Sequence, residues 1–365
     1  MKIRSGTTSV ITMLALVSFT SAAEVPGEFP ASPLCTTFVG PAFILPDELG
    51  AMVAVHAGPL RGVSFLSLKT GRAEGSISIP YRFLSATMPR GDGVLVLALS
   101  DGKRIRISSV NLANLKVTST EVLPGIDVRL AAFSPNGKYL LGVSELGAIF
   151  KVNLATQKVD IIEGATVVAA SLAVSHTGAK LYVAGDGLTE IDVDRMKVSS
   201  KLTSEKNLLE VVVTPDDHAL ALRNWHDIEL LDLAPSKSGA MLASAEVDPI
   251  PNGASISSTS RLAFSGDGGT LFYVRASKTD SEVISLSAND LHVEARVTVG
   301  PDPEAIAIVP DRRWLLFARG FAGHGQLQAI DLKTQTVVFK AALPGNPSNP
   351  TNQSLRCARS SSTSN

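Results

Sequence analysis

The sequence is poor in several features that define particular classes of protein. Aromatic residues make up 5% of its 365 residues, and only two cysteines occur. Basic and acidic residues nearly balance, 33 against 34. This balance argues against a nucleic-acid-binding protein, because such proteins carry a basic surplus. Two distant cysteines also exclude a C-x-x-C-H haem attachment, a cysteine-ligated iron–sulfur cluster and a cysteine-based zinc cluster in this chain.

The common catalytic signatures are missing as well. The sequence has no G-x-S-x-G, H-E-x-x-H, G-x-x-x-x-G-K or G-x-G-x-x-G motif. Its histidines are scattered singly, with no spacing that places two ligands on one face: His56, His176, His218, His226, His292 and His324. No nucleophile is paired with a base, so the sequence does not indicate covalent catalysis. We therefore expect no bound metal and no cofactor.

Long apolar runs are scarce, and the clearest one lies at the N-terminus. Lys2 and Arg4 precede an apolar stretch from Val10 to Phe19, and small residues follow up to Ala23. This pattern predicts a signal peptide over residues 1–23 and a secreted or periplasmic product. The stretch is too short to span a bilayer, which argues against the alternative of a retained anchor. We expect no membrane span once the signal is removed.

What the sequence does have is an internal repeat. The clearest copy is Phe133–Val143, with related stretches beginning at Ile44, Thr87, Val174, Val213, Phe264 and Ile308. The second turn position of each copy is Pro46, Pro89, Pro135, His176, Pro215, Gly266 and Pro310. Successive spacings are 43, 46, 41, 39, 51 and 44 residues. Seven units of about 44 residues therefore account for residues 24–344.

Each unit has the chemistry of short antiparallel strands. In Ser134–Gly137, proline, asparagine and glycine occupy the positions that a type I turn favours, and apolar residues flank the turn. A second half-motif such as Glu229–Leu233 alternates apolar and polar residues, as a half-buried strand does. Four strands per unit predict an all-β, seven-bladed β-propeller over residues 24–344. A solenoid of strands is the alternative, but its repeats are usually shorter.

The two cysteines flank the predicted propeller. Cys35 and Cys357 lie near the two ends of the mature chain, and an exported protein meets oxidising conditions. A disulfide between them would latch the terminal blades, whereas two unpaired buried thiols are the alternative. We expect the C-terminal tail, residues 345–365, to be partly disordered.

The turn pattern x-S-P-D/N-G-k-x-L-x-V, followed by I-D-L/V-x-T, resembles the YVTN-type β-propeller repeat family. The closest matches to its wording are Leu181–Ala184 and Gly300–Ala307, and the resemblance covers about residues 36–343. His176 and Gly266 depart from it by lacking the proline. The Trp-Asp and Gly-His signatures of WD40 repeats are absent. The resemblance implies a propeller but several functions, among them secreted surface proteins, lactonase-like enzymes and subunits of periplasmic dehydrogenases.

Antiparallel strands place the ends of the second strands, together with the connections between blades, on one face. Arg275 and Arg319 share one repeat position there, and Arg223 stands one place earlier. The candidate ligand-binding residues on this face are Arg275, Arg319, Arg223, His226, Glu145, Asp186 and His324. Two guanidinium groups from neighbouring blades could hold a carboxylate or phosphate at the mouth of the channel. Alternatively, each arginine pairs with an acidic residue or extends into water.

The interpretation we favour is an exported, non-enzymatic binding or scaffold protein. Its loop face would recognise a protein partner or a small anionic ligand near the axial channel, and Ala234–Ser260 would form a polar loop suited to partner contact. We expect no nucleic-acid partner. Two alternatives stay open, a lactonase-like hydrolase and an accessory subunit of a periplasmic dehydrogenase.

Overall fold

The computed structural model divides the chain into two units, Met1–Leu34 and Cys35–Asn365, and describes parts of the second. The described residues are 43–44, 51–56, 62–67, 73–78, 81–87, 94–124, 126–203, 207–234, 236–247, 262–275, 281–299, 303–309, 314–319, 326–331 and 333–342. The expected signal peptide, both cysteines and the tail after residue 344 lie outside these ranges. In the described part, no helix has the length and apolar character needed to cross a membrane.

All regular secondary structure in these ranges is β-strand, and the strands form seven four-stranded antiparallel sheets. The first two sheets comprise β1 (Phe43–Ile44), β2 (Ala51–His56), β3 (Gly62–Ser67) and β4 (Ala73–Ser78), then β5 (Arg82–Thr87), β6 (Val94–Ser100), β7 (Arg104–Asn111) and β8 (Lys116–Pro124). The third and fourth comprise β9 (Val128–Phe133), β10 (Tyr139–Ser144), β11 (Ala148–Asn153) and β12 (Val159–Thr166), then β13 (Ala169–Val174), β14 (Lys180–Gly185), β15 (Gly187–Asp192) and β16 (Lys197–Thr203).

The remaining three sheets follow the same order. They comprise β17 (Glu210–Val213), β18 (Ala219–Arg223), β19 (Asp227–Asp232) and β20 (Met241–Glu246), then β21 (Leu262–Phe264), β22 (Thr270–Arg275), β23 (Glu282–Ser287) and β24 (Val293–Thr298), then β25 (Pro303–Val309), β26 (Trp314–Arg319), β27 (Gln326–Asp331) and β28 (Thr336–Ala342). In each sheet, the four strands pair in chain order. The predicted all-β propeller with four antiparallel strands per blade is confirmed.

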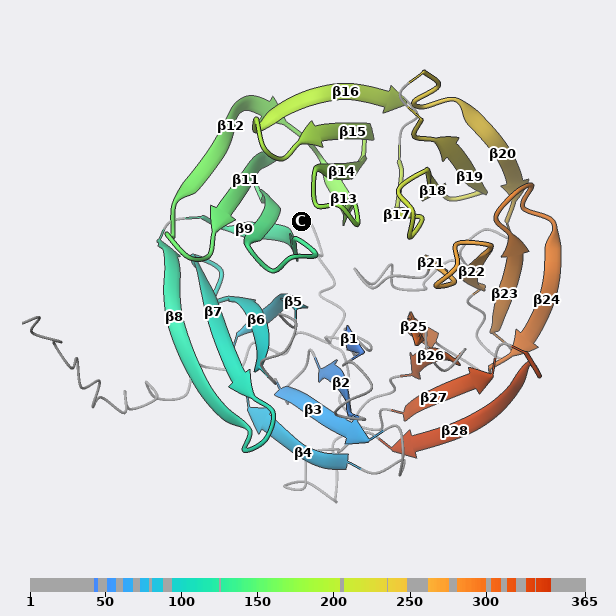
Figure 1. Ribbon diagram of the computed structural model, residues 1–365, viewed down its shortest axis with the longest axis horizontal. Helices are drawn as coiled ribbons and strands as arrows, with labels where there is room; N and C mark the ends of the chain where they lie inside the picture. The colour runs from blue at the N-terminus through green and yellow to red at the C-terminus, as the bar shows by residue number, and fades with distance from the viewer. Residues whose placement is uncertain are drawn as a thin grey trace, which may run out of the picture. The chain divides into compact units, whose positions relative to one another are not determined.

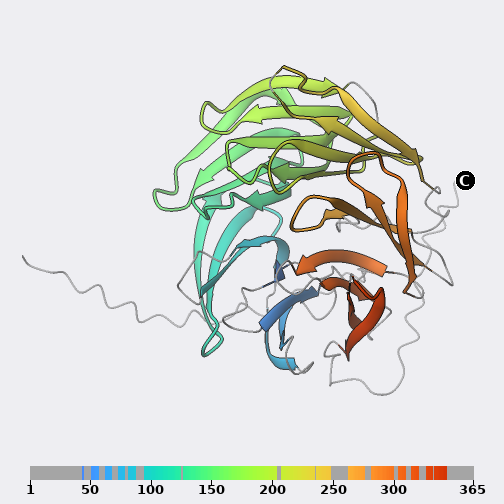
Figure 2. The same ribbon diagram turned by 45° about the vertical axis from the view of Figure 1, so that its right-hand side comes forward.

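The first strand of each sheet is the innermost one (Figure 1). Contacts between first strands run from β5 to β9, β13, β17, β21 and β25 in turn, and from β25 back to β1. Figure 2 shows that the strands of one sheet are rotated progressively from the inner to the outer edge, as the twist of a β-sheet requires. Small side chains such as Ala131 and Ala263 lie on these crowded inner strands.

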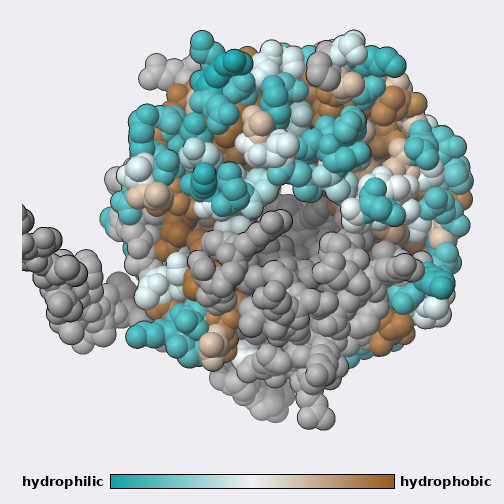
Figure 3. All heavy atoms as spheres, in the orientation of Figure 1, coloured by the Kyte–Doolittle hydropathy of each residue, from teal (hydrophilic) through white to brown (hydrophobic). Residues whose placement is uncertain are grey.

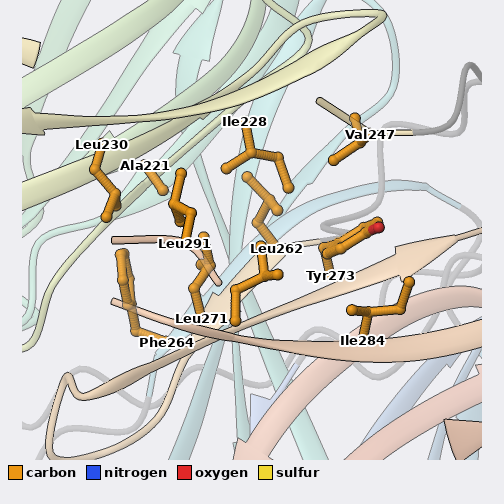
Figure 4. Packing of buried hydrophobic residues seen from close by; sticks show 11 residues of the cluster. Ala221, Ile228, Leu230, Val247, Leu262, Phe264, Leu271, Tyr273, Ile284 and Leu291 are labelled. Atoms are coloured by element: carbon orange, nitrogen blue, oxygen red, sulfur yellow. The ribbon is translucent and has the colours of Figure 1, made fainter. Parts of the chain in front are cut away.

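The hydrophobic core lies between neighbouring sheets. One cluster joins Ala221, Ile228 and Leu230 of the fifth sheet to Leu262 and Tyr273 of the sixth (Figure 4). Similar clusters join the second to the third, third to the fourth, fourth to the fifth, and sixth to the seventh sheets. Second strands are covered on both sides and are therefore almost continuously apolar, whereas outer strands such as β20 are largely exposed.

Side-chain hydrogen bonds within the turn stabilise the connection between the first and second strands. In the third sheet, Ser134 Oγ donates to Asn136 Oδ1 at 2.7 Å and accepts from the Tyr139 amide at 3.0 Å. Thr214 with Asp216 and Ser265 with Asp267 repeat this arrangement in the fifth and sixth sheets. The S-P-N/D-G sequence of the repeat therefore specifies a turn that its own side chains stabilise by hydrogen bonds.

Turns of neighbouring sheets also contact one another. A Cβ on Gly178 would lie 3.6 Å from Pro135 Cδ, and one on Gly268 would lie 3.3 Å from Pro215 Cδ. Between these two contacts the pattern changes, because His176 replaces the proline and Asp217 replaces the glycine. The Asp217 carboxylate accepts hydrogen bonds from the His176 and Thr177 amides at 2.6 and 2.9 Å.

The Asp or Asn of the second half-motif caps the turn between the third and fourth strands. Asn153 Oδ1 accepts from the Ala155 and Thr156 amides, and Asp331 Oδ1 accepts from the Lys333 and Thr334 amides. Asp192 bonds the Arg195 amide in the same way at 2.8 Å. These side chains therefore stabilise turns, as Asx motifs do.

One sequence expectation is corrected. The polar segment Ala234–Ser260 was expected to be a loop, but β20 lies within it and pairs with β19 as the outer strand of the fifth sheet. The error arose because Met241 and Leu242, the large apolar residues of β20, are adjacent and exposed, so the strand lacks the alternation of a half-buried strand. The part of the segment from 248 to 260 lies outside the described residues.

Candidate functional site

The sheets have two different ends. At one end lie the turns just described, which join first to second and third to fourth strands. At the other end the second strands finish, the third strands begin, and each fourth strand leads into the next sheet. We call this second end the loop face, and the candidate residues that the structure describes lie on it or next to it.

Arg275 is the last residue of β22 and lies opposite Glu282 of β23 in the strand register. Its Nε is 3.5 Å from Glu282 Oε2, and the same carboxylate oxygen is 3.3 Å from a guanidinium nitrogen of Arg296. Two guanidiniums thus share one carboxylate. An anionic ligand at Arg275 would compete with Glu282. For this arginine, the structure therefore agrees with our alternative interpretation, in which each arginine pairs with an acidic residue.

Arg319 shares the strand-end position of Arg275, whereas Arg223 is buried. Arg319 ends β26 as Arg275 ends β22, so the shared repeat position holds in the backbone, but the Arg319 side chain lies outside the described part. Arg223 is only 3% exposed. It stands one place earlier in the repeat, at the position of Val274, which is fully buried. This offset places Arg223 inside the sheet, opposite Glu210 of β17 and Ile228 of β19 in the strand register, where the second strand is covered on both sides.

Glu145 lies in the loop that joins β10 to β11 and is exposed. Its backbone amide donates to the Asp127 carbonyl at 2.8 Å, and its carboxylate is 3.9 Å from a guanidinium nitrogen of Arg129. Both side chains of this ion pair are about two-fifths exposed. Such an exposed pair contributes little to stability and leaves both groups accessible.

Asp186 occupies the tight loop between β14 and β15 and is exposed. The neighbouring Gly185 is fixed from two sides, since its carbonyl accepts the Leu208 amide at 2.9 Å and a Cβ there would overlap the Val168 carbonyl. Val167 in turn donates its amide to the Gly147 carbonyl at 3.0 Å. The loops of the third and fourth sheets are therefore held together through their backbones.

His226 and its neighbour Trp225 form the corresponding loop of the fifth sheet, and both are exposed. Asn224 shapes this loop, because its Oδ1 accepts from the His226 and Asp227 amides at 2.7 Å each. The Leu209 amide donates to the Arg223 carbonyl at 2.7 Å, which ties this loop to the segment that follows the fourth sheet.

The structure thus brings together Glu145, Asp186 and the Trp225–His226 loop on three consecutive sheets, and places Arg275 on a fourth. His324 lies outside the described residues. Sequence reasoning missed Glu282 and Arg296, although hairpin pairing across β22 and β23 would have found the first. It also missed two exposed apolar residues of the loop face, Leu146 and Val168. In the described part, no three His, Cys, Asp or Glu side chains are grouped to hold a metal ion.

Comparison with known proteins supports the fold. No family model and no curated protein matches the chain. A chain in the crystal structure of a mitotic checkpoint complex matches with a TM-score of 0.58 at 15% identity, covering 85% of this chain and 96% of that chain. Hydrazine synthase of Kuenenia stuttgartiensis matches with a TM-score of 0.60 at 14% identity, covering 88% of this chain and 100% of that chain. At these identities the likeness shows the fold alone, which is that of a β-propeller.

Proposed function

We propose that the protein is an exported, non-enzymatic β-propeller of the YVTN type, which binds a protein partner or a small anionic ligand on its loop face. The leader pattern of residues 1–23 supports export, and the hydrogen-bonded S-P-N/D-G turns support the repeat type. The matched chain named for a mitotic checkpoint complex comes from a protein assembly, which agrees with a propeller used for binding.

The observation that carries the proposal is the difference between the two ends of the sheets. At the turn end, polar side chains such as Ser134, Asn136 and Asp331 bond their own turns. On the loop face, backbone hydrogen bonds and a few side chains such as Asn224 hold the loops, whereas Asp186 and Trp225 extend into solvent. Side chains that the framework does not use are available to a ligand, on loops positioned by a rigid scaffold.

The test is affinity capture from the extracytoplasmic fraction of the source cells, with bound proteins and small molecules identified by mass spectrometry. The bait is the full mature chain. Two loop-face variants, Arg275→Ala/Arg319→Ala and Glu145→Lys/Asp186→Lys, are compared with a turn-end control, Arg195→Ala/His218→Ala. We expect a species that wild type and control retain and at least one loop-face variant loses.

Equal capture by all four proteins, or no capture, contradicts the proposal. Lactone turnover that Arg275→Ala abolishes also contradicts it and favours a hydrolase. Capture of a haem or quinone protein would instead identify the partner of a dehydrogenase subunit, which is the other alternative.

A further inference from the structure

Five exposed residues lie on the loop face of the third, fourth and fifth sheets and of the connections between them, and we call them the rim patch: Glu145, Leu146, Val168, Asp186 and Trp225. Its apolar members are accessible to solvent, since Leu146 is 87%, Val168 59% and Trp225 37% exposed. The space-filling view shows hydrophobic residues mostly as separate areas among hydrophilic ones (Figure 3). Exposed apolar residues that adjoin one another and are bordered by charged groups are typical of interaction sites.

Backbone contacts tie the loops of the rim patch together. Leu146 precedes Gly147, whose carbonyl accepts the Val167 amide, and Val168 abuts Gly185, the residue before Asp186. From Gly185 the connection continues through the Leu208 amide and the Leu209–Arg223 hydrogen bond to the loop of Trp225. These loops carry little freedom to lose on binding, which favours affinity.

The charge around the patch has one predominant sign. In these loops, the segment before β9 and the adjoining strand ends, the described charged residues include four carboxylates, Asp127, Glu145, Asp186 and Asp227, and one exposed guanidinium, Arg129. Arg129 forms an ion pair with Glu145 at 3.9 Å. The remaining negative charge attracts a cationic partner and repels anionic ones, including anionic lipid surfaces.

We infer that the rim patch binds a peptide segment of a partner protein that carries apolar side chains next to lysine or arginine. This inference rests on the proposed loop-face function and specifies the partner's chemistry. The apolar side chains of the segment would cover Leu146, Val168 and Trp225, and its cationic groups would face Asp186 and Glu145. Burial of the apolar contacts supplies affinity, whereas the acidic border selects the charge of the partner.

The test begins with selection of random dodecamer peptides, displayed on phage, against the immobilised full mature chain. Enriched peptides are synthesised with a fluorescent label, and their affinity is measured by anisotropy. We expect them to combine Leu, Ile, Val or Phe with Lys or Arg, and to bind more weakly as NaCl rises from about 50 to 300 mM.

Two variants address the two halves of the argument. Leu146→Ser/Val168→Ser removes the apolar contacts, and Glu145→Lys/Asp186→Lys reverses the charge. Each should weaken binding by about tenfold or more, since a tenfold change corresponds to one well-made contact. The matched control Met241→Ser/Val293→Ser alters residues of similar exposure on the outer strands and should leave affinity within about twofold.

A measurement on the wild-type protein makes the test independent of variant folding. Bound peptide should slow amide hydrogen exchange in 144–147, 167–170, 185–187 and 224–227. The inference is overturned by failure to enrich any peptide, by enrichment of acidic or uncharged peptides, by wild-type affinity in both variants, or by protection confined to other segments. If selection fails while capture still depends on Arg275 and Arg319, the loop-face function stands and only the partner chemistry is wrong.

Discussion

At the scale of single residues, two departures from the repeat compensate one another. His176 stands at the proline position of its turn, and Asp217 stands at the glycine position of the next turn. In the neighbouring pairs of sheets, the residues at these two positions contact each other as proline and glycine. Here His176 and Asp217 are in contact instead. Asp217 adopts a φ of 60°, in the left-handed region that glycine otherwise occupies here. The carboxylate hydrogen bonds to the His176 and Thr177 amides offset this strain.

This arrangement predicts different effects for two substitutions of Asp217. Asp217→Ala loses both hydrogen bonds and keeps a side chain in the left-handed region, so it should lower the free energy of unfolding by about 1–3 kcal/mol. Asp217→Gly loses the same bonds but relieves the strain, and should be more stable than the alanine variant by about 1 kcal/mol. Urea denaturation measures both values, and an alanine variant as stable as the glycine variant would contradict the account.

At the scale of elements, close contacts within one sheet decide where small residues stand. Gly142 of β10 lies opposite Ala131 of β9 and Phe150 of β11. A Cβ on Gly142 would overlap the Phe150 ring and come within 2.5 Å of the Leu130 carbonyl oxygen. The repeat pattern predicts an apolar strand here. Only the assembled sheet shows that the Phe150 ring occupies the space where a side chain of residue 142 would lie.

We therefore expect Gly142→Ala to lower the free energy of unfolding by about 2–4 kcal/mol, because backbone or ring must shift in a close-packed interior. The matched control is Gly102→Ala in an exposed loop. Gly102 has a φ of 92° and open space around its Cβ position, so only backbone strain of about 1–2 kcal/mol applies. Thermal and urea unfolding distinguish the two, and a Gly142→Ala variant no less stable than Gly102→Ala would refute the packing argument.

Outer strands share a second feature, which is a register shift near the start of the strand. In five sheets, one residue near the start of the fourth strand has no partner on the third: Glu74, Ser199, Leu242, Glu294 and Val338. Such bulges twist an edge strand and discourage edge-to-edge pairing between molecules. This explains how outer strands with exposed apolar residues such as Leu242 are tolerated.

At the scale of the whole molecule, neighbouring sheets are also joined by side chains that accept backbone amides. Ser85 Oγ accepts from the Phe133 amide, Ser171 Oγ from the Val211 amide, and Glu210 Oε1 from the Leu262 amide. Each bond runs from the first strand of one sheet to the first strand of the next. Ser171 and Glu210 share one repeat position, five residues before His176 and Pro215, so one position joins two of these junctions, and Ser85 stands one place later in its unit.

Substitution of Glu210 tests the contribution of these hydrogen bonds between sheets, because its carboxylate and the Leu262 amide are both buried. Glu210→Ala leaves a buried donor unsatisfied and should cost about 1–3 kcal/mol of unfolding free energy. Glu210→Gln keeps an acceptor oxygen and should recover much of that loss. Hydrogen exchange at Leu262 provides the local readout, and unchanged protection in Glu210→Ala would count against this contribution.

Acid should destabilise the molecule through its turn carboxylates. A hydrogen bond from the Thr214 hydroxyl lowers the pKa of Asp216 below its ordinary value of 3.8, and one from the Ser265 hydroxyl does so for Asp267. Backbone amides lower the pKa of Asp192 and Asp331. For Asp217, burial alone would raise the pKa, but hydrogen bonds from the Thr177 and His176 amides outweigh it.

Because these pKa values are lower in the folded state, the unfolded chain binds more protons between the two values. The stabilisation is present above the unfolded pKa and is lost as pH falls through the folded values. Urea midpoints should therefore decline below about pH 4. Asp217→Asn should reduce the slope of that decline, and a wild-type midpoint independent of pH in this range would contradict the prediction.

The sequence alone determined the fold class and the position of most strands. Turn residues and the alternation of apolar side chains act locally, so Ser134–Gly137 and Glu229–Leu233 indicate their strands without knowledge of any partner. The outer strand β20 was not predicted, because large apolar and polar side chains do not alternate along Met241–Glu246. The shared position of Arg275 and Arg319 followed directly from the repeat spacing.

Only the tertiary structure decided what those side chains do. Strand pairing placed Glu282 beside Arg275, and a one-residue offset buried Arg223. The rim patch joins residues of three sheets whose loops are connected by backbone hydrogen bonds. Local patterns specify strands and turns because their causes lie within a few residues. The surface that a partner meets depends on contacts between units about 40 residues apart, which packing alone brings together.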